Sequence, residues 1–355
     1  MAYTTIDNPS EHFTTVLTTS TGSAITIDTG FKPDWLWTKA RDQVRSHELH
    51  DTNRGDNKRI KADSNDAEES YSSYLAFTSD GATLGTNHNL GYHAGGTTTG
   101  VCWAWKANGG TATATISESG NNPAATVQAN TTAGFSIITY TGTGASGTIA
   151  HGLGARPKMV WIKNRDAAEG WYINAELITN NGNGSLHFNT DAEYTGGSNN
   201  MTDSSVDTNN IHVISSGNVN TDGQKYVAYV STPIQGYSKF GVFHSDNNAD
   251  GTFVYLGFKP KLLIAKNITQ THNNHDWIMF DNVRETSNEI DTFLRANEST
   301  VETTSGRNEV DFLSNGFKAR ASYGDFNGGS NHEFIYYAWA ESPFVSSKGV
   351  PTTAF

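Results

Sequence analysis

The sequence predicts an all-β protein built from three tandem β-sandwich domains that are related by an internal repeat. The first observation is the composition: there are 35 glycines, aromatic residues make up 11% of the chain and hydrophobic residues only 35%. Small polar residues, glycine and aromatics together are typical of many short strands joined by turns. The second observation is that few stretches keep a helical period over three turns, so we expect little helix.

The third observation is a passage that occurs three times. GFKPDWLWTKARD begins at Gly30, GARPKMVWIKNRD at Gly154 and GFKPKLLIAKNIT at Gly257. In each copy the glycine allows a turn that other residues resist, and a proline three residues later fixes φ where a strand begins. Successive apolar residues beyond the proline place apolar side chains on both faces of that strand. We therefore expect an interior strand that is covered on both sides.

The segments around this passage recur in a fixed order. Stretches that start at Phe13, Phe135 and Phe240 alternate apolar and polar residues on both sides of a turn, as β-hairpins do. After the passage come NDAEES, TDAEYT and RANEST, then a glycine turn, and then the apolar strands VCWAWKA, YVAYVS and IYYAWAE. Each copy has about a hundred residues, which is enough for a core of its own.

These landmarks set the expected domain boundaries. The three copies are residues 1–107, 134–235 and 236–344. Residues 108–133 are rich in Gly, Thr and Ala, so we predict a flexible linker there, with ATVQA as the one stretch that could form a strand. Residues 345–355 are expected to be a polar, irregular tail.

Charge and cysteine content restrict the function classes. The net charge is −12, which argues against a nucleic-acid surface because such a surface needs a basic stripe. The single cysteine, Cys102, excludes an intrachain disulfide and is expected in the core. No apolar run approaches the roughly 20 residues of a membrane span. The stretch MAYTTIDNPS lacks the basic and apolar regions of a signal peptide, so we expect a soluble chain without membrane insertion.

Several separate motifs resemble a β-domain that is repeated in structural and tail-fibre proteins of marine tailed bacteriophages. They are MAYTTIDNPSEHFTTVL, GFKPDWLW, TVQANTTAGFSIITYTG followed by HGLGARPKMVWIKNRD, and AESPFVSSKGVPTTAF. The resemblance implies lectin-like, jelly-roll-type sandwiches in a virion component on the tail or capsid surface. It also implies other virion proteins as partners, self-association (often as a trimer) and synthesis in the host cytoplasm. It supplies no catalytic motif.

Two sets of charged residues recur between the copies. The third copy has Asp281 and Arg284 in WIMFDNVR, and the first has Asp51 and Arg54 in HELHDTNR, but Ala175 and Ile178 take these places in the second. We interpret the pairs as local ion pairs that close a turn; the alternative is a binding site that the middle copy lacks. A lysine also recurs six residues beyond each proline, and we predict that it pairs with a nearby carboxylate rather than ending a strand in solvent: Lys39, Lys163 and Lys266.

Two histidine clusters are candidate metal ligands. His47, His50 and Asp51 lie in HELHD, and His272, His275 and Asp276 lie in HNNHD. An HxxH spacing brings both side chains to one face only in a helix, and these stretches are predicted to be strand or turn. We therefore assign no metal ligands and expect loop and surface histidines, with zinc as the alternative.

The stretch DNNADG, residues 246–251, resembles the start of a calcium loop. It lacks the distal glutamate of such loops, and Asx-Gly turn chemistry explains it without an ion. We therefore predict no cofactor, and calcium is the alternative because oxygen ligands from such loops are common in carbohydrate-binding sandwiches.

The remaining hypothesis concerns sugars. Trp171 and Trp277 flank the polar loops AAEGWY and NNHDWI, and their rings could either stack on a glycan or pack inside the protein. We found no G-x-S-x-G elbow and no phosphate-binding loop, so we predict no enzyme. The sequence-based hypothesis is a non-enzymatic bacteriophage virion structural protein: tail fibre, tail-associated or capsid decoration. The alternatives are a glycan-binding module for host attachment and, next, a polysaccharide depolymerase.

Overall fold

The computed structural model describes residues 2–91, 97–174, 184–196, 206–269, 275–306, 309–322 and 326–352. Within these ranges the chain consists of antiparallel strands, turns and one 3-10 helix, η1 (Pro9–Glu11), and it contains no α-helix. None of these residues belongs to a helix that is long and apolar enough to cross a membrane. The prediction of an all-β protein is confirmed.

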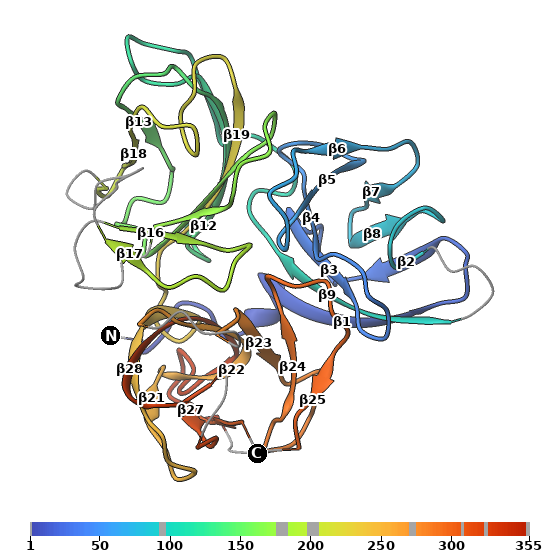
Figure 1. Ribbon diagram of the computed structural model, residues 1–355, viewed down its shortest axis with the longest axis vertical. Helices are drawn as coiled ribbons and strands as arrows, with labels where there is room; N and C mark the ends of the chain where they lie inside the picture. Colours follow the sequence, from blue (N-terminus) through green and yellow to red (C-terminus); the bar gives the residue numbers. More distant parts are fainter. Residues whose placement is uncertain are drawn as a thin grey trace.

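The strands form three units, each of which has a large and a small sheet (Figure 1). In unit 1 the large sheet has the order β1-β9-β3-β4-β5-β6 and the small sheet the order β2-β8-β7. Their bounds are β1 (Phe13–Ser20), β9 (Thr98–Trp105), β3 (Trp35–Ala40), β4 (Glu48–Asp51), β5 (Lys58–Lys61), β6 (Glu69–Ser70), β2 (Ile25–Asp28), β8 (Gly81–Leu84) and β7 (Leu75–Phe77).

Unit 2 has a large sheet of order β10-β11-β12-β19-β14-β15-β16-β17 and a small sheet of β13 and β18. The strands are β10 (Ala114–Ile116), β11 (Ala125–Asn130), β12 (Phe135–Thr141), β19 (Lys225–Ser231), β14 (Met159–Asn164), β15 (Tyr172–Ile173), β16 (Gly184–His187), β17 (Thr195–Gly196), β13 (Gly147–Ala150) and β18 (Asn210–Val213).

Unit 3 has a large sheet of order β20-β28-β22-β23-β24-β25 and a small sheet of order β21-β27-β26. The strands are β20 (Ser238–Asp246), β28 (Ser330–Pro343), β22 (Phe258–Asn267), β23 (Ile278–Asp281), β24 (Thr292–Arg295), β25 (Thr303–Thr304), β21 (Phe253–Tyr255), β27 (Gly316–Ala319) and β26 (Val310–Leu313).

The recurring sequence passage forms the same strand in every unit. It is β3, β14 or β22, and it pairs on one side with the last strand of its unit, which in turn pairs with β1, β12 or β20. The β-hairpins predicted from Phe13, Phe135 and Phe240 are wrong, because the two strands of each expected hairpin lie in different sheets: β1 and β2, β12 and β13, and β20 and β21. The glycines that precede it, Gly30, Gly154 and Gly257, have φ of +76°, +67° and +83°, where a side chain would be strained. All six residues of β3 are buried, as expected for a strand covered on both faces.

The expected linker at residues 108–133 is wrong. Strands β10 and β11 lie in this stretch and extend the large sheet of unit 2 beyond β12. The start of the stretch is anchored to unit 1, because the carboxylate of Asp34 accepts backbone N–H groups from Ala107, Gly109 and Gly110. Thr and Ala, which composition associates with flexibility, here serve as ordinary strand residues.

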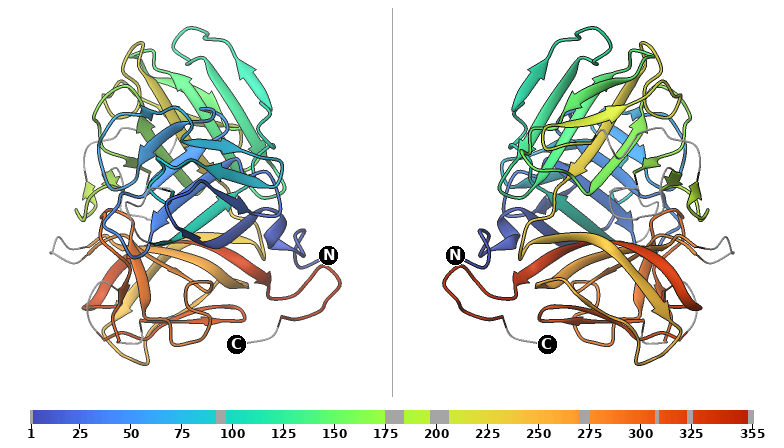
Figure 2. Two further views of the ribbon diagram at one scale, coloured as in Figure 1. Left: turned by 90° about the vertical axis from the view of Figure 1, so that its right-hand side faces the viewer. Right: turned by 90° about the vertical axis from the view of Figure 1, so that its left-hand side faces the viewer.

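The central strands of each large sheet are buried on both faces. One face packs on the small sheet of its own unit, in cores that include Leu36 in unit 1, Val160 in unit 2 and Leu263 in unit 3. The other face contributes to a fourth core that the three units share, and whose largest members are Trp35, Trp37, Trp103, Trp105, Trp161, Trp171, Tyr229, Trp277, Tyr337 and Trp339. The three lobes therefore surround a common centre (Figures 1 and 2).

Aromatic contacts cross each boundary between units in this shared core. The ring of Trp35 lies 4.4 Å from that of Tyr229, so unit 1 contacts unit 2. The rings of Trp161 and Tyr337 lie 5.0 Å apart, which joins units 2 and 3. The units are thus not independent domains, because each loses apolar contacts if another is removed.

Trp161→Ala is expected to lower the free energy of unfolding by about 3–5 kcal/mol, as for large buried aromatics in general. All three units should still unfold in one transition, because the ring contacts Trp35 and Tyr337 of the neighbouring units. Denaturant unfolding followed by tryptophan fluorescence and circular dichroism measures both quantities. Val44→Ala, at a side chain that is 68% exposed, is the matched control and should change little. Separate transitions of the units would contradict a common core.

Candidate functional site

Polar groups meet at the boundaries between the units, where the recurring lysines lie. Each lysine ammonium donates to the carbonyl of the next residue and to a carbonyl of another unit. The partners are Ala40 and Ser299 for Lys39, Asn164 and Asn65 for Lys163, and Asn267 and Asp191 for Lys266. Unit 1 thus binds unit 3, unit 2 binds unit 1 and unit 3 binds unit 2, which closes a ring of equivalent contacts.

The predicted carboxylate partners of these lysines need correction, since main-chain carbonyls take their place. Burial lowers the pKa of Lys39 and of Lys163 to about 8, because an ammonium group loses hydration inside the protein. Several carbonyl oxygens around one ammonium offset part of this loss. The recurring lysine therefore hydrogen-bonds one unit to the next and is not a solvated strand end.

The two Asp–Arg pairs lie beside the shared core with their side chains fully buried. Nε of Arg54 is 2.5 Å from Oδ2 of Asp51, and Nε of Arg284 is 2.6 Å from Oδ2 of Asp281. Each arginine also donates to a carbonyl of the preceding strand, that of Leu49 or Met279. Both pairs close local turns and are buried in the protein.

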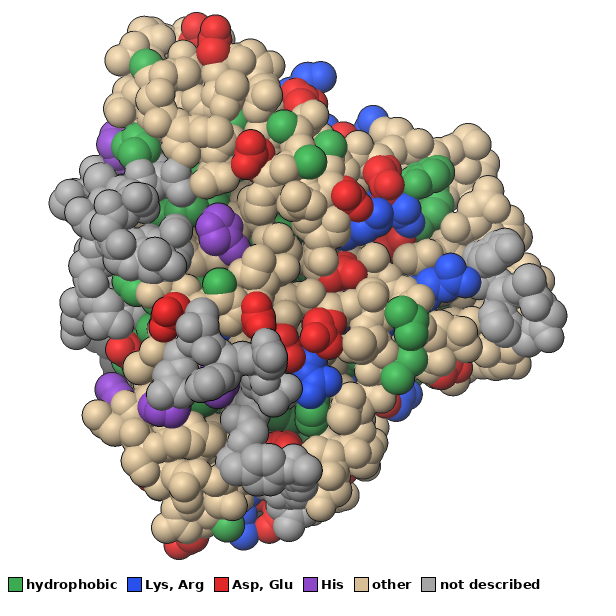
Figure 3. Space-filling view, viewed as in Figure 1, with side chains coloured by type: hydrophobic (Ala, Val, Ile, Leu, Met, Phe, Trp, Pro, Cys, Tyr) green, Lys and Arg blue, Asp and Glu red, His purple; other side chains and the backbone are tan. Residues whose placement is uncertain are grey.

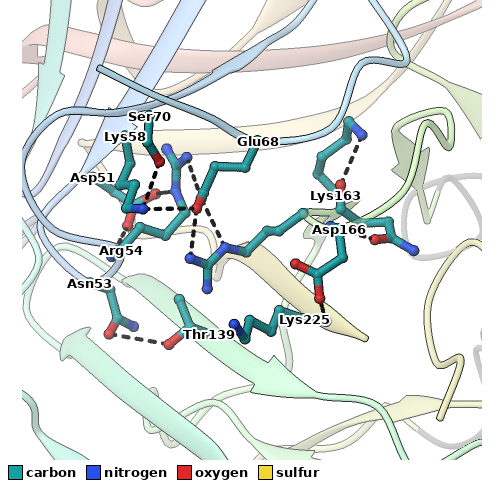
Figure 4. A network of polar contacts seen from close by, with 12 residues as sticks. Asp51, Asn53, Arg54, Lys58, Glu68, Ser70, Thr139, Lys163, Asp166 and Lys225 are labelled. Carbon is teal, nitrogen blue, oxygen red and sulfur yellow. Dashed lines mark hydrogen bonds and ion pairs between the residues drawn. The ribbon is translucent and has the colours of Figure 1, made fainter. Parts of the chain in front are cut away.

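Each pair extends across a unit boundary through a glutamate and a second arginine. Glu68 accepts from Arg54 of its own unit at 3.2 Å and from Arg165 of unit 2 at 2.9 Å (Figure 4). The hydroxyl of Tyr229 in unit 2 donates to Asp51 at 2.7 Å. Within the buried part of the network two carboxylates face two guanidiniums, and the partly exposed ammonium of Lys58 lies 3.9 Å from Glu68 at its edge.

The boundary between units 3 and 1 repeats this arrangement. Glu302 accepts from Arg284 at 3.0 Å and from Arg41 of unit 1 at 2.6 Å. The indole N–H of Trp103 donates to Asp281 at 3.2 Å, in the place that Tyr229 takes at the other boundary. Two of the three boundaries therefore each contain a network of the same kind, made of an Asp–Arg pair, a glutamate and an arginine of the neighbouring unit.

At the boundary between units 2 and 3, Ile268 and Tyr194 take the places of the arginine and the glutamate. A backbone bond that runs from Glu68 N to Arg165 O, and from Glu302 N to Arg41 O, runs here from Tyr194 N to Ile268 O. Ile268 thus stands where the other boundaries have arginine. Ala175 and Ile178 lie outside the described residues. The hydroxyl of Tyr337, the counterpart of Tyr229, is buried and has no hydrogen-bond partner among the residues described.

These backbone bonds also correct the sequence alignment. The segment of unit 3 that matches NDAEES begins at Ser299 and not at Arg295, because Glu302 makes the contact that Glu68 makes. The sequence carried a usable signal: the position two residues after the recurring lysine is Arg41, Arg165 and Ile268. The segments that meet these residues contribute Glu302, Glu68 and Tyr194, so both partners change together.

Trp171 and Trp277 do not form a glycan platform. Their side chains are 1% and 0% exposed, which leaves no ring face for a sugar. The indole of Trp171 donates to the carbonyl of Lys61 in unit 1 at 2.6 Å, and that of Trp277 to the carbonyl of His187 in unit 2 at 3.1 Å. Both tryptophans lie at unit boundaries, where the neighbouring unit supplies the carbonyl that accepts from the indole.

The histidines in HELHD are buried and not at the surface. Because side chains alternate along β4, Glu48 and His50 face the core of unit 1, whereas Leu49 and Asp51 face the shared core. His47 precedes the strand and accepts the indole N–H of Trp37 at 2.9 Å. His47, His50 and Asp51 therefore do not converge on one point.

The other two candidate ion sites have protein partners. In HNNHD, His272 lies outside the described residues, and Asp276 pairs with Nε of Arg295 at 2.8 Å. In DNNADG, Oδ1 of Asp246 accepts from Asn327, and Asp250 pairs with Lys318. These carboxylate oxygens are engaged by amide and ammonium groups of the chain itself.

Two surface hollows lie next to the charge networks. The hollow next to Arg165 has a volume of about 250 Å³ and is lined by residues of unit 2, among them Arg165, Lys225, Thr115, Thr126 and Thr139. The three threonines lie in register across β10, β11 and β12. The hollow at the boundary of units 3 and 1 has about 420 Å³ and is lined by Arg41, Asp42, Thr99, Val301 and Glu302.

Comparison with known families identifies the class to which the chain belongs. Residues 8–343 match the family described as Domain of unknown function (DUF7483), so the chain is a member of this family over nearly its whole length. No curated protein matches the chain. No solved structure matches it either.

Asp51→Ala is expected to destabilise the protein by about 3–5 kcal/mol, because it removes the nearer carboxylate of the buried Arg54 and leaves Glu68 as its remaining partner. The double variant Asp51→Ala with Arg54→Ile copies the residues at positions 175 and 178 and should recover a large part of the loss. Denaturant unfolding of the single and double variants measures the difference. A double variant as unstable as Asp51→Ala would contradict the view that the pair is replaceable as a unit.

The stability contributed by Glu68 should vanish in acid. Burial alone would raise the pKa of this carboxyl, but the hydrogen bond from Arg165 and the charge of Arg54 outweigh it, so the pKa in the folded protein is lowered. A lowered folded pKa means that Glu68 stabilises the fold above its ordinary pKa near 4.5 and stops doing so as the pH falls through the folded value.

Glu68→Gln should therefore cost about 1.5–3 kcal/mol at pH 7 and progressively less below pH 4.5. Unfolding free energies between pH 7 and pH 3 measure this convergence. Glu118→Gln, at an exposed position, is the control and should run parallel to the unmodified protein. A constant difference at every pH would show that the ionised carboxylate is not what Glu68 contributes.

Proposed function

We propose that the chain is a non-enzymatic structural protein of a tailed-bacteriophage virion, carried on the tail or capsid surface as a fibre, tail-associated or decoration component. The observation that carries the proposal is the closure of three units of one strand order around a shared core. This construction produces one block out of modules that would otherwise move independently, which suits a part that transmits or resists force. The resemblance of MAYTTIDNPSEHFTTVL and the recurring passages to virion proteins supports it.

Within this proposal the units are lectin-like, jelly-roll-type sandwiches that arose from one repeated module. Three features support this origin: the common order of the large sheets, the three positive-φ glycines and the ring of lysine contacts. The middle unit then diverged by adding β10 and β11 and by losing the charged residues at its boundary with unit 3.

The partners in this proposal are other virion proteins, and the protein reaches the particle from the host cytoplasm. The chain already places three similar units around one centre, so its fold offers a threefold-like surface even as a single copy (Figure 1). Self-association, including a trimer, is expected from the resemblance. On the face drawn in Figure 3, basic side chains lie beside acidic ones in no continuous stripe, which favours protein partners over nucleic acid.

Mass spectrometry of purified particles of the phage that encodes the chain tests the proposal. The protein should co-purify with the particle at a fixed ratio to known tail or capsid proteins, and cryo-electron microscopy should place the three-lobed density on the particle surface. Abundant protein in the infected cell together with its absence from purified particles would overturn the assignment.

A second function, binding of a host-surface glycan, is favoured by the hollow that residues of unit 2 line beside Arg165. Threonine hydroxyls in register and the ammonium of Lys225 there offer donors, acceptors and a positive charge to an acidic sugar chain. Arg165 is already engaged by Glu68, so Lys225 is the cation that would meet a ligand. This site replaces the tryptophan platform that the sequence suggested.

A glycan array probed with the full chain, with and without calcium, tests this second function. Binding should favour acidic polysaccharides and fall at least tenfold in Lys225→Ala, whereas Lys348→Ala, in the C-terminal tail, is the control and should bind unchanged. Equal binding by both variants would exclude the hollow. Shortened polysaccharide after incubation would favour the depolymerase alternative.

A further inference from the structure

Three titratable side chains meet in the core of unit 1, away from the network between the units. Glu48 and His50 come from the same face of β4, and His88 comes from the turn after β8. All three are 0% exposed. Oε2 of Glu48 lies 3.3 Å from Nε2 of His88 and 4.0 Å from Nε2 of His50, and the two Nε2 atoms are 3.2 Å apart.

These distances match the dimensions of a zinc site. The point that is equidistant from the three atoms lies about 2.1 Å from each of them, as follows from the three sides of the triangle. Zn–N bonds to histidine and Zn–O bonds to carboxylate are about 2.0–2.2 Å long. An ion at that point lies in the plane of the three atoms, so tetrahedral coordination requires the 4.0 Å distance between Glu48 and His50 to shorten.

An independent observation is the free oxygen of Glu48. Its Oε1 accepts from the hydroxyl of Tyr74 at 2.7 Å and pairs with the guanidinium of Arg59, whereas Oε2 is buried and has no hydrogen-bond partner among the described residues. A buried carboxylate oxygen without a partner is unfavourable. Arg59 also pairs with Glu69, so the cluster is negative by one charge before any cation binds.

The imidazole rings of His50 and His88 differ in whether Nε2 is free of a proton and can bind an ion. Nδ1 of His50 lies 2.8 Å from the carbonyl of Lys58 and must donate to it, which leaves Nε2 free as a ligand in the arrangement that metal-binding histidines commonly have. Nδ1 of His88 accepts the N–H of Leu90 at 3.1 Å, so Nε2 carries the proton in the neutral ring. An ion requires that proton to move to Nδ1, which breaks the bond to Leu90 and weakens binding without changing its stoichiometry.

The other units lack this cluster. The register places Tyr172 and Asn174 in unit 2, and Ile278 and Phe280 in unit 3, where unit 1 has Glu48 and His50. The fold itself therefore accepts apolar side chains at both positions. The described partners of these side chains in unit 1 engage Oε1 of Glu48 and the Nδ1 atoms of both histidines, but not Oε2 of Glu48.

We propose that Glu48, His50 and His88 bind one Zn²⁺ ion through Oε2 and the two Nε2 atoms. The three ligands leave the fourth position of a tetrahedral ion to a water molecule or another small ligand. Because the site lies inside unit 1, the ion joins β4 to the turn after β8 and serves to stabilise the unit.

Titration of the full chain with Zn²⁺ alone, after treatment with a chelator, tests this inference. One equivalent is expected to bind and to raise the melting temperature. His50→Phe, which copies unit 3, and His88→Gln should each weaken binding at least tenfold, whereas His244→Gln, at an exposed position, should not. Absence of binding by the unmodified chain, or equal binding by all variants, overturns the proposal.

Zinc-edge X-ray absorption of the unmodified protein decides the question even if a variant does not fold. Two imidazole nitrogens with oxygen ligands at about 2.0–2.2 Å support the site. Fewer than two imidazoles, or an oxygen-only shell, would show that zinc binds elsewhere on the chain.

Discussion

The structure depends on the burial of each large sheet from both sides. A sheet covered on one face by its own small sheet and on the other by two neighbouring units has no face left for solvent, so its strands are apolar at successive positions. In β3, Trp35 and Trp37 face the shared core while Leu36 faces the core of unit 1. The shared core therefore requires apolar residues at successive positions of the central strands. It also makes the stability of each unit depend on the others.

Burial on both faces leaves polar main-chain groups at the unit boundaries that water reaches poorly. The recurring lysines donate to several of these carbonyls, and the buried Asp–Arg–Glu–Arg networks lie between them. The boundary around Ile268 and Tyr194 has apolar contacts in place of the charges. The same backbone geometry thus accepts a balanced charge network or an apolar pair, but not half of either, since an unmatched buried charge is far more costly than its absence.

The sequence predicts local features of this fold and not the contacts between its units. The two-residue period and the glycine–proline turns identify β3, β14 and β22, because these depend on residues next to one another. The contact between Arg165 and Glu68 joins residues 97 positions apart, and no periodicity encodes it. For the same reason Trp171 resembles a surface aromatic in the sequence: the polar residues beside it are visible, but the unit that covers it is not.

Strand β4 connects the two kinds of buried polar group in unit 1. Its residues alternate, so Asp51 points to the charge network at the boundary while Glu48 and His50 point to the cluster inside the unit. Beyond its pairing with β3 and β5 and the burial of Leu49, this four-residue strand is held by polar groups on both faces. The pairing of Arg54 with Asp51 fixes one face. The other face has Arg59 on one oxygen of Glu48, while the second oxygen lies between two imidazoles, where we propose that an ion binds. The charge network and the cluster therefore act on one strand, and whatever occupies the cluster also holds Asp51 in place at the boundary with unit 2.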